Sequence, residues 1–304
     1  MPAAAIRASL AVIYDRLYSH RSQALIEHWI MNLSILGFLV HLALVFLART
    51  LAHPPTLIAA VGMNYLSAIY TPFSFILFYE VLMLIAALPQ STTQSIAKQY
   101  EIVSLIFIRR FFKDIAGLDD IGKLSQLTRD LLPVFTDVVA GLFMFLLVTV
   151  FLHAARAGRL PEGAREETGA LKKFIARKKS IAVTLTLLLV SLAVHSIWDF
   201  AREVFAAAHV DPNTSFYSEV FTVMIFTDVL IVILSLAVSD RYELVFRNGA
   251  FVISTILIRF SLTVARPFAA ELAVTGMIFG IATLLIYNYH ARIRQPDRPL
   301  LKPT

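Results

Sequence analysis

Long apolar runs separated by short polar stretches recur along the whole chain. Most of these runs approach the roughly 20 residues that an α-helix needs to cross about 30 Å of hydrocarbon. The third and seventh runs are the shortest, and each is interrupted by arginine. The pattern predicts eight membrane-spanning helices, at about 30–50, 64–88, 99–116, 133–154, 181–203, 217–239, 248–265 and 268–290.

The composition points to the same class of protein. Of the 304 residues, 58% are hydrophobic and 16% are charged, whereas a soluble domain is usually about 45–50% apolar and about 25% charged. The chain has no cysteine, which excludes disulfides, thiolate metal sites, iron–sulfur clusters and cysteine nucleophiles. We therefore predict an all-α integral membrane protein.

Basic residues concentrate in the predicted loops. They crowd the connection at about 156–180 and the tail at 293–304. Eight spans place both regions on the side of the N-terminal segment, 1–28, which we expect to be an amphipathic surface helix. Since basic loops face the cytoplasm, we predict that both termini are cytoplasmic. The net charge of +6 then reflects orientation and contact with anionic lipid head groups, and not nucleic-acid binding.

Four charged residues stand where hydrocarbon is expected. Glu80 and Arg109 lie in the second and third spans, and Asp228 and Arg259 lie in the sixth and seventh. A charge at bilayer depth costs about 2.5–3.5 kcal/mol unless it is paired or wetted. Since antiparallel neighbours bring each acid and its arginine to similar depth, the sequence predicts two ion pairs, each facing the interior of the bundle.

The chain also predicts a tandem repeat of two four-span units, at 29–155 and 181–292, joined by the basic linker at 156–180. An even number of spans per unit gives both units the same orientation, related by an axis along the membrane normal. Matching residues occur in the same order in both units. They are His41 and His195, Glu80 and Asp228, Ser104 and Ser254, Pro133-Asp137 and Pro267-Glu271, and His153 and His290.

The second half, about 185–292, carries a series of short motifs. These are Phe226-Thr227-Asp228, Phe246-Arg247, Ile253 to Arg259 in the pattern Ile-x-x-Ile-x-Ile-Arg, Pro267-Phe268, and Leu285-Ile286-Tyr287-Asn288 before a basic tail. They resemble the phosphate-starvation-inducible PsiE family of small four-span bacterial membrane proteins. The resemblance implies a duplicated four-span unit in the bacterial inner membrane. It brings no settled reaction, substrate or cofactor.

The first half, about 30–155, resembles the same family less closely. It keeps Phe78-Tyr79-Glu80 and Ile108-Arg109. It departs from the pattern at Tyr100-Glu101, where a basic residue such as Arg247 is expected, and it has a longer loop after Arg109 and the added Arg110. The partner of Arg109 is therefore less firmly predicted than that of Arg259.

The four buried charges allow several interpretations. A structural ion pair would fix the register of two helices, and loss of one partner would cost about 3–5 kcal/mol. A proton or ion path is the functional alternative, because burial and a nearby arginine shift the proton affinity of a carboxylate in opposite directions. An anion site on Arg109 and Arg259, with Arg110 beside them, is a third.

Histidines and further acids are secondary candidates. His41 and His195 lie within predicted spans, and imidazole is a common axial ligand of haem. Each half offers one such histidine, so a haem-bearing electron carrier would need them to meet across the repeat; the alternative is a hydrogen-bonded packing residue. Asp137 and Glu271, each four residues after a proline, complete the candidate set.

Motifs for catalysis or phosphate binding are not found in the sequence. It has no Gly-x-Ser-x-Gly elbow, no His-Glu-x-x-His helix and no Walker-type loop. We expect no catalytic residue, no metal and no cofactor. Gly141, Gly276 and Gly280 permit close helix approach, either between the halves or in a homodimer. The leading hypothesis is a proton or ion conduction unit, and the alternative is a structural or regulatory subunit of a larger membrane complex.

Overall fold

The computed structural model describes residues 2–51, 55, 58, 64–116, 124–158, 169–205, 212–236, 242–264 and 268–293. Within these ranges the secondary structure is helical throughout, which confirms the all-α prediction. The helices are α1 (Pro2–Leu17), α2 (His20–Thr50), α4 (Ser67–Ala87), α5 (Thr92–Ala116), α6 (Leu124–Ala157), α7 (Gly169–Phe205), α8 (Pro212–Leu236), α9 (Tyr242–Thr263) and α10 (Phe268–Ile293). Much of the predicted linker, Pro267 and almost all of the tail lie outside the described residues.

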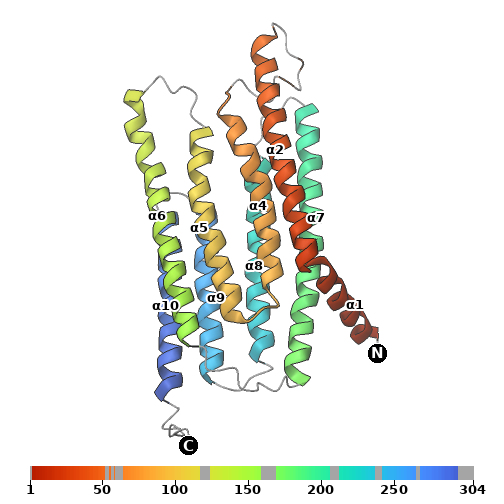
Figure 1. Ribbon diagram of the computed structural model, residues 1–304, viewed down its shortest axis with the longest axis vertical. Coiled ribbons are helices and arrows are strands. Elements are labelled where there is room, and N and C mark those ends of the chain that lie inside the picture. Colours follow the sequence, from red (N-terminus) through yellow and green to blue (C-terminus); the bar gives the residue numbers. More distant parts are fainter. Residues whose placement is uncertain are drawn as a thin grey trace, which may run out of the picture.

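Eight helices, from α2 to α10, lie side by side and alternate in direction, and α1 leaves the bundle at an angle (Figure 1). Six of them, α2, α4, α6, α7, α9 and α10, contain stretches long and apolar enough to cross a membrane. Helix α5 is not among them, because charged residues spread along it leave no stretch that is apolar enough. The structure thus supports a membrane-embedded helical protein, while spans at α5 and α8 stay predictions.

The helices form two rows, α2–α4–α5–α6 and α7–α8–α9–α10, in the same order (Figure 1). Between the rows, α6 packs against α10, α5 against α9, and α4 against α7. A two-fold axis between the rows would instead bring α6 beside α7. The halves therefore stack like on like at α5 and α9 and at α6 and α10, while α4 packs on α7. The second row is thus displaced sideways from the first, and is not rotated about an axis along the membrane normal as expected from the sequence.

Side-chain burial shows the same stacking. On α5, Ile96 and Val103 are buried toward the second row, whereas Phe246 and Ile253 at the matching positions of α9 are 54% and 52% exposed. The opposite face reverses this, since Leu105 on α5 is 44% exposed and Thr255 at the matching position of α9 is fully buried. The face of α9 that meets the first row is thus the face that α5 turns outward.

Two apolar clusters hold the rows together. One joins α5, α6, α9 and α10 around Tyr100, Phe107, Phe151 and Phe251. The other joins α4, α7 and α8 and includes Tyr18, between α1 and α2. Both draw side chains from both halves, so the halves bury a shared core.

Glycines allow close contacts between helices. One such contact occurs at an equivalent position in each half. A Cβ on Gly141 would lie 2.8 Å from Ile108 Cγ1 on α5, and a Cβ on Gly276 would lie 2.9 Å from Ile258 Cγ2 on α9. A Cβ on Gly280 would collide with the hydroxyl of Tyr100, which lies across the row interface. Gly280 thus packs the two halves together, one of the two uses expected from the sequence, whereas Gly276 packs α10 on α9 within the second half.

The N-terminal segment differs from its expected form. The sequence predicts one surface helix within 1–28, whereas α1 ends at Leu17 and α2 begins at His20. The Tyr14 hydroxyl donates to the Ala86 carbonyl at 2.5 Å, and the Tyr18 and Thr186 hydroxyls share a hydrogen bond of 2.6 Å. Burial raises the pKa of both tyrosines, so they stay protonated. Helix α1 is thus anchored to the bundle.

Gly280→Ala is expected to lower the free energy of unfolding by about 1–3 kcal/mol, because the added methyl overpacks the contact with Tyr100. The matched control is Gly249→Ala, where a Cβ meets no atom within 4 Å. That change should be neutral or slightly stabilising, since alanine favours helix over glycine. Thermal unfolding in detergent, followed by circular dichroism, measures both, and equal midpoints would contradict the packing role of Gly280.

Candidate functional site: two ion pairs in unequal surroundings

The structure brings both predicted ion pairs together. Glu80 on α4 binds Arg109 on α5 through Oε1 and Nη2. Asp228 on α8 binds Arg259 on α9, with 2.8 Å between Oδ2 and Nη1. In each case the two helices are antiparallel neighbours joined by a short connection, which places an acid and an arginine about 30 residues apart at the same height, given a rise of about 1.5 Å per residue.

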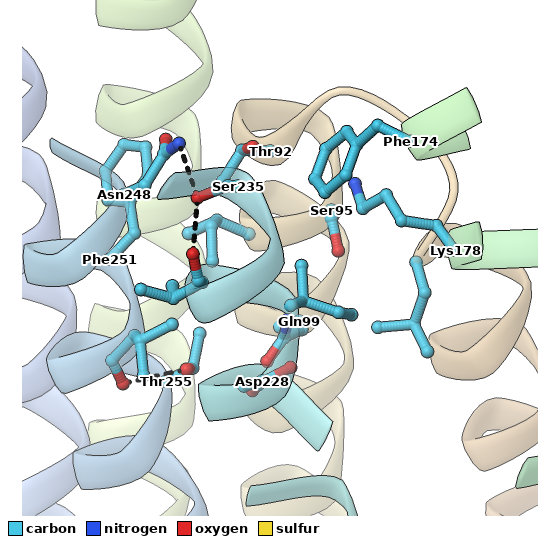
Figure 2. A pocket seen from close by; sticks show the side chains of 15 residues that line it. Thr92, Ser95, Gln99, Phe174, Lys178, Asp228, Ser235, Asn248, Phe251 and Thr255 are labelled. Carbon is cyan, nitrogen blue, oxygen red and sulfur yellow. Dashed lines mark hydrogen bonds between the residues drawn. The ribbon is translucent and has the colours of Figure 1, made fainter. Parts of the chain in front are cut away.

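The second pair is fully enclosed and includes a third residue. Asp228 is 6% exposed and Arg259 is 2% exposed. Arg259 Nη2 also donates to Gln99 Oε1 on α5 at 3.0 Å, and Figure 2 shows Gln99 beside Asp228. Because Gln99 belongs to the first row, this triad links the two halves through charge-assisted hydrogen bonds.

A small cavity lies beside the second pair (Figure 2). Its volume is about 40 Å³, enough for one or a few water molecules. Lys178 of α7 lines it and is only 4% exposed. Its Nζ donates to the Gln90 carbonyl at 2.9 Å and lies 5.4 Å from the centre of the Phe174 ring. The sequence places Lys178 among solvated linker charges, and the structure corrects this.

The first pair borders a much larger space. A cleft of about 500 Å³ lies between α2, α4 and α5, and Glu80 lines it. Glu80 is 7% exposed, and its Oε2 makes no hydrogen bond within the described part of the chain. The polar end of the cleft holds Gln23, Glu27 and Lys98. Tyr79 donates to Glu27 at 3.3 Å, and Lys98 binds Glu101 at 3.0 Å.

The cleft and the cavity occupy matching positions in the two halves. When α4 and α5 are aligned with α8 and α9 on the ion pairs, six lining positions coincide. They are Glu80 and Asp228, Met83 and Ile231, Ala87 and Ser235, Lys98 and Asn248, Ile102 and Val252, and Leu105 and Thr255. The like-on-like stacking places Ser95 and Gln99 of α5 over the second space, whereas the first opens on the outer face of the first row.

Arg110 has a different role from Arg109. Its Nη2 donates to the Ser261 and Leu262 carbonyls at 3.0 and 3.3 Å, and its guanidinium lies 4.4 Å from the centre of the Phe107 ring. A cation at the carbonyl end of a helix is favoured by the helix dipole, so Arg110 ties α5 to the end of α9. With Arg109 and Arg259 bound to acids, the structure does not assemble the anion site considered from the sequence.

The histidines are not brought together as a ligand pair. His41 Nδ1 lies 2.6 Å from Thr71 Oγ1, and its Nε2 lies 3.3 Å from Ser67 Oγ. Both ring nitrogens are thus engaged by hydroxyls of α4, as in a packing residue. His195 is an exposed residue of α7.

The two remaining acidic candidates lie in different surroundings. Asp137 on α6 is 2% exposed, whereas Glu271 is exposed in the first turn of α10, where the helix dipole favours an acid. Among the described residues no group of three or more His, Asp and Glu side chains is placed to hold a metal ion.

Comparisons of the chain with models of protein families, with curated proteins and with solved structures gave no match. The resemblance to the PsiE family therefore stays a hypothesis. Function has to be argued from the geometry of the two pairs.

Three residues at the site are absent from the sequence-based candidates. Gln99 and Lys178 lie at the ends of apolar runs, where polar residues are ordinary. Tyr100 is one aromatic among many, yet its hydroxyl lies 2.5 Å from Ser254 Oγ across the row interface. The sequence signal for Gln99 and Lys178 was a polar side chain at the edge of a predicted span. This signal is weak, because spans commonly begin with such residues.

Asp228→Asn is expected to lower the free energy of unfolding by about 3–5 kcal/mol, because it leaves the Arg259 charge buried without its counter-ion. The double variant Asp228→Leu/Arg259→Met should recover most of that loss, since well-packed apolar residues often replace a buried pair at little cost. Thermal unfolding in detergent compares the two. A double variant no more stable than the single one would show that the pair is not the stabilising unit.

Proposed function

We propose that this chain is an eight-span protein of the bacterial inner membrane that moves protons or small cations by way of Glu80 and Arg109. In this proposal Asp228 and Arg259 hold the two halves together. The observation that carries the proposal is the difference between the two spaces. Glu80 lines a cleft of about 500 Å³, whereas Asp228 lines a cavity of about 40 Å³ covered by α5.

The chemistry of Glu80 suits reversible binding. A buried carboxylate is costly unless it is compensated, and Arg109 compensates it through Oε1. Glu80 Oε2 is buried and makes no hydrogen bond within the described residues, so a proton that reaches it gains an acceptor without first breaking the ion pair. Asp228 binds Arg259, which also binds Gln99, and it lines a cavity of only about 40 Å³, which suits a permanent link.

The cleft also provides a route from one end of the bundle. Gln23 and Gln90 lie at its polar end, near the start of α2 and between α4 and α5. Leu105 lines it 13 residues after the start of α5, which corresponds to about 20 Å along the helix axis. Glu80 is thus approached from the end of the bundle where α4 ends and α5 begins (Figure 1).

Eight spans are supported by helix length and direction. Helices α5 and α8 have 25 residues each, enough for about 30 Å of hydrocarbon. The start of α2 and the end of α10 lie at the same end of the bundle (Figure 1). The basic residues at the end of α6, the start of α7 and the end of α10 lie at that end (Figure 1), which the positive-inside rule assigns to the cytoplasm. The resemblance to the PsiE family supports the same location and a duplicated four-span unit.

A structural or regulatory subunit is the second candidate. The triad of Asp228, Arg259 and Gln99 favours it, because these residues join the two halves. This role explains the second pair by itself. It would extend to the whole protein only if Glu80 also proved inactive.

The topology is open to test because the chain has no cysteine. Ser91→Cys, between α4 and α5, is expected to react with a membrane-impermeant maleimide from the cytoplasmic side. Lys113→Cys, near the end of α5, and Leu51→Cys, after α2, should react from the opposite side. Labelling of right-side-out and inverted vesicles measures this. Reaction of positions 91 and 113 from the same side would rule out a span at α5.

The transport role predicts that purified protein in liposomes carries proton or sodium flux above that of empty vesicles. Glu80→Gln and the neutral pair Glu80→Gln/Arg109→Gln should reduce the flux to the empty-vesicle level, because the binding carboxylate is gone. The double variant avoids a stranded arginine, so its loss is not explained by misfolding.

Two controls separate the roles of the pairs in that experiment. Glu271→Gln removes an exposed carboxylate of α10 that does not line the cleft and should leave flux intact. Asp228→Leu/Arg259→Met should also retain flux if that pair is structural. Flux that depends on Asp228 and not on Glu80 would show that the transport role belongs to the second pair, and would contradict the proposal.

A further inference from the structure

The cleft beside Glu80 is larger than a proton or a small ion requires. At about 500 Å³ it falls within the roughly 300–1,000 Å³ that is typical of small-molecule sites. Its walls are mainly apolar and come from Ile30, Met31, Ile76, Met83 and Leu105. Methionine adapts to ligands of irregular shape. These dimensions and surfaces suit an organic molecule with a hydrophobic body.

The charges in the cleft favour one sign of ligand. Glu80 stands on the inner wall and Glu27 at the polar end. The two nearby cations are occupied, since Arg109 binds Glu80 and Lys98 binds Glu101. Tyr79 donates its hydroxyl to Glu27 and so holds that carboxylate at the cleft. What the cleft offers to a ligand is therefore carboxylate oxygen, which accepts hydrogen bonds and attracts cations.

We propose that this cleft binds a hydrophobic organic cation, such as a lipophilic ammonium or phosphonium. The charged centre lies beside the carboxylates of Glu80 and Glu27, which line the cleft, and the apolar body lies against the isoleucines and methionines. This proposal rests on the proposed function in that it names the class of cation that Glu80 handles. An organic anion would meet two carboxylates, and a neutral lipid chain would leave the buried acid without a new partner.

The matching cavity in the second half cannot serve the same ligand. Its volume of about 40 Å³ is too small, and Lys178 places an ammonium group in its wall. Gln99 from the first row already occupies Arg259. The chain should therefore bind one organic cation and not two, although the two halves carry equivalent acid–arginine pairs.

A proton and an organic cation compete for the same carboxylate in this arrangement. Binding of either one to Glu80 lowers the affinity for the other, because one carboxylate compensates one added charge at a time. By linkage the effect is reciprocal. A cation that enters the cleft therefore favours release of a proton, which couples the two species in opposite directions.

The test is a calorimetric titration of the full chain in detergent with tetraphenylphosphonium. We expect saturable binding of one ion per chain. The control ligand is tetraphenylborate, which has the same shape and the opposite charge and should not bind at that site. Equal binding of the two ions would show partition into apolar surface and would overturn the proposal.

Variants locate the site independently of folding. Leu105→Trp fills the rim of the cleft from an exposed position and should weaken tetraphenylphosphonium binding by about tenfold or more, a difference of about 1.4 kcal/mol. Glu80→Gln/Arg109→Gln should abolish binding, and Glu271→Gln, which removes an exposed carboxylate of α10 outside the cleft, should leave it unchanged. Unaltered affinity in Leu105→Trp would place the ligand elsewhere and overturn the proposal.

The two proposals fail in distinguishable ways. Tetraphenylphosphonium binding without proton or sodium flux in liposomes supports the binding site and overturns the transport function. Flux that depends on Glu80 without any binding of tetraphenylphosphonium supports the transport function and overturns the organic-cation site.

Discussion

A charge inside an apolar bundle has to find its opposite within the same bundle, and this constraint organises the fold. Hydrocarbon offers no solvation to Glu80, Arg109, Asp228 or Arg259, so each acid and arginine must face each other across two helices. Antiparallel neighbours satisfy this only in a narrow range of registers. Both pairs form in the structure between adjacent helices, and they set how α4 lies on α5 and how α8 lies on α9.

The stacking of the two rows then gives equivalent pairs unequal surroundings. A row displaced onto its copy covers one face of the second unit and leaves the same face of the first unit open. Gln99 completes the second pair from across the interface, whereas the first pair remains beside the cleft. A two-fold arrangement would have treated both pairs alike. The difference between the proposed working pair and the proposed structural pair thus arises from packing.

Substitutions between matching positions follow this difference. Where the second half faces the first row, Thr255 replaces Leu105 and Ser235 replaces Ala87. Asn248 replaces Lys98 and lies within 3.5 Å of Ser235 Oγ. Small polar groups that bond to one another suit a closed cavity. Larger apolar side chains suit the part of the cleft that faces lipid, and a paired lysine suits its polar end. The residues in each half therefore match the space that packing creates.

The sequence by itself determined the helical membrane class, the ion-pair partners and most of the helix positions, because hydrophobic runs and buried charges act through local periodicity and spacing. Only the tertiary structure decided that the rows stack like on like, that Gln99 and Lys178 enter the second site, and that Arg110 caps α9 in place of joining Arg109. These depend on contacts between α5 and helices more than a hundred residues away along the chain. No local pattern records which face of a helix meets such a distant partner, and this is the physical reason why the open cleft at Glu80 became visible only in three dimensions.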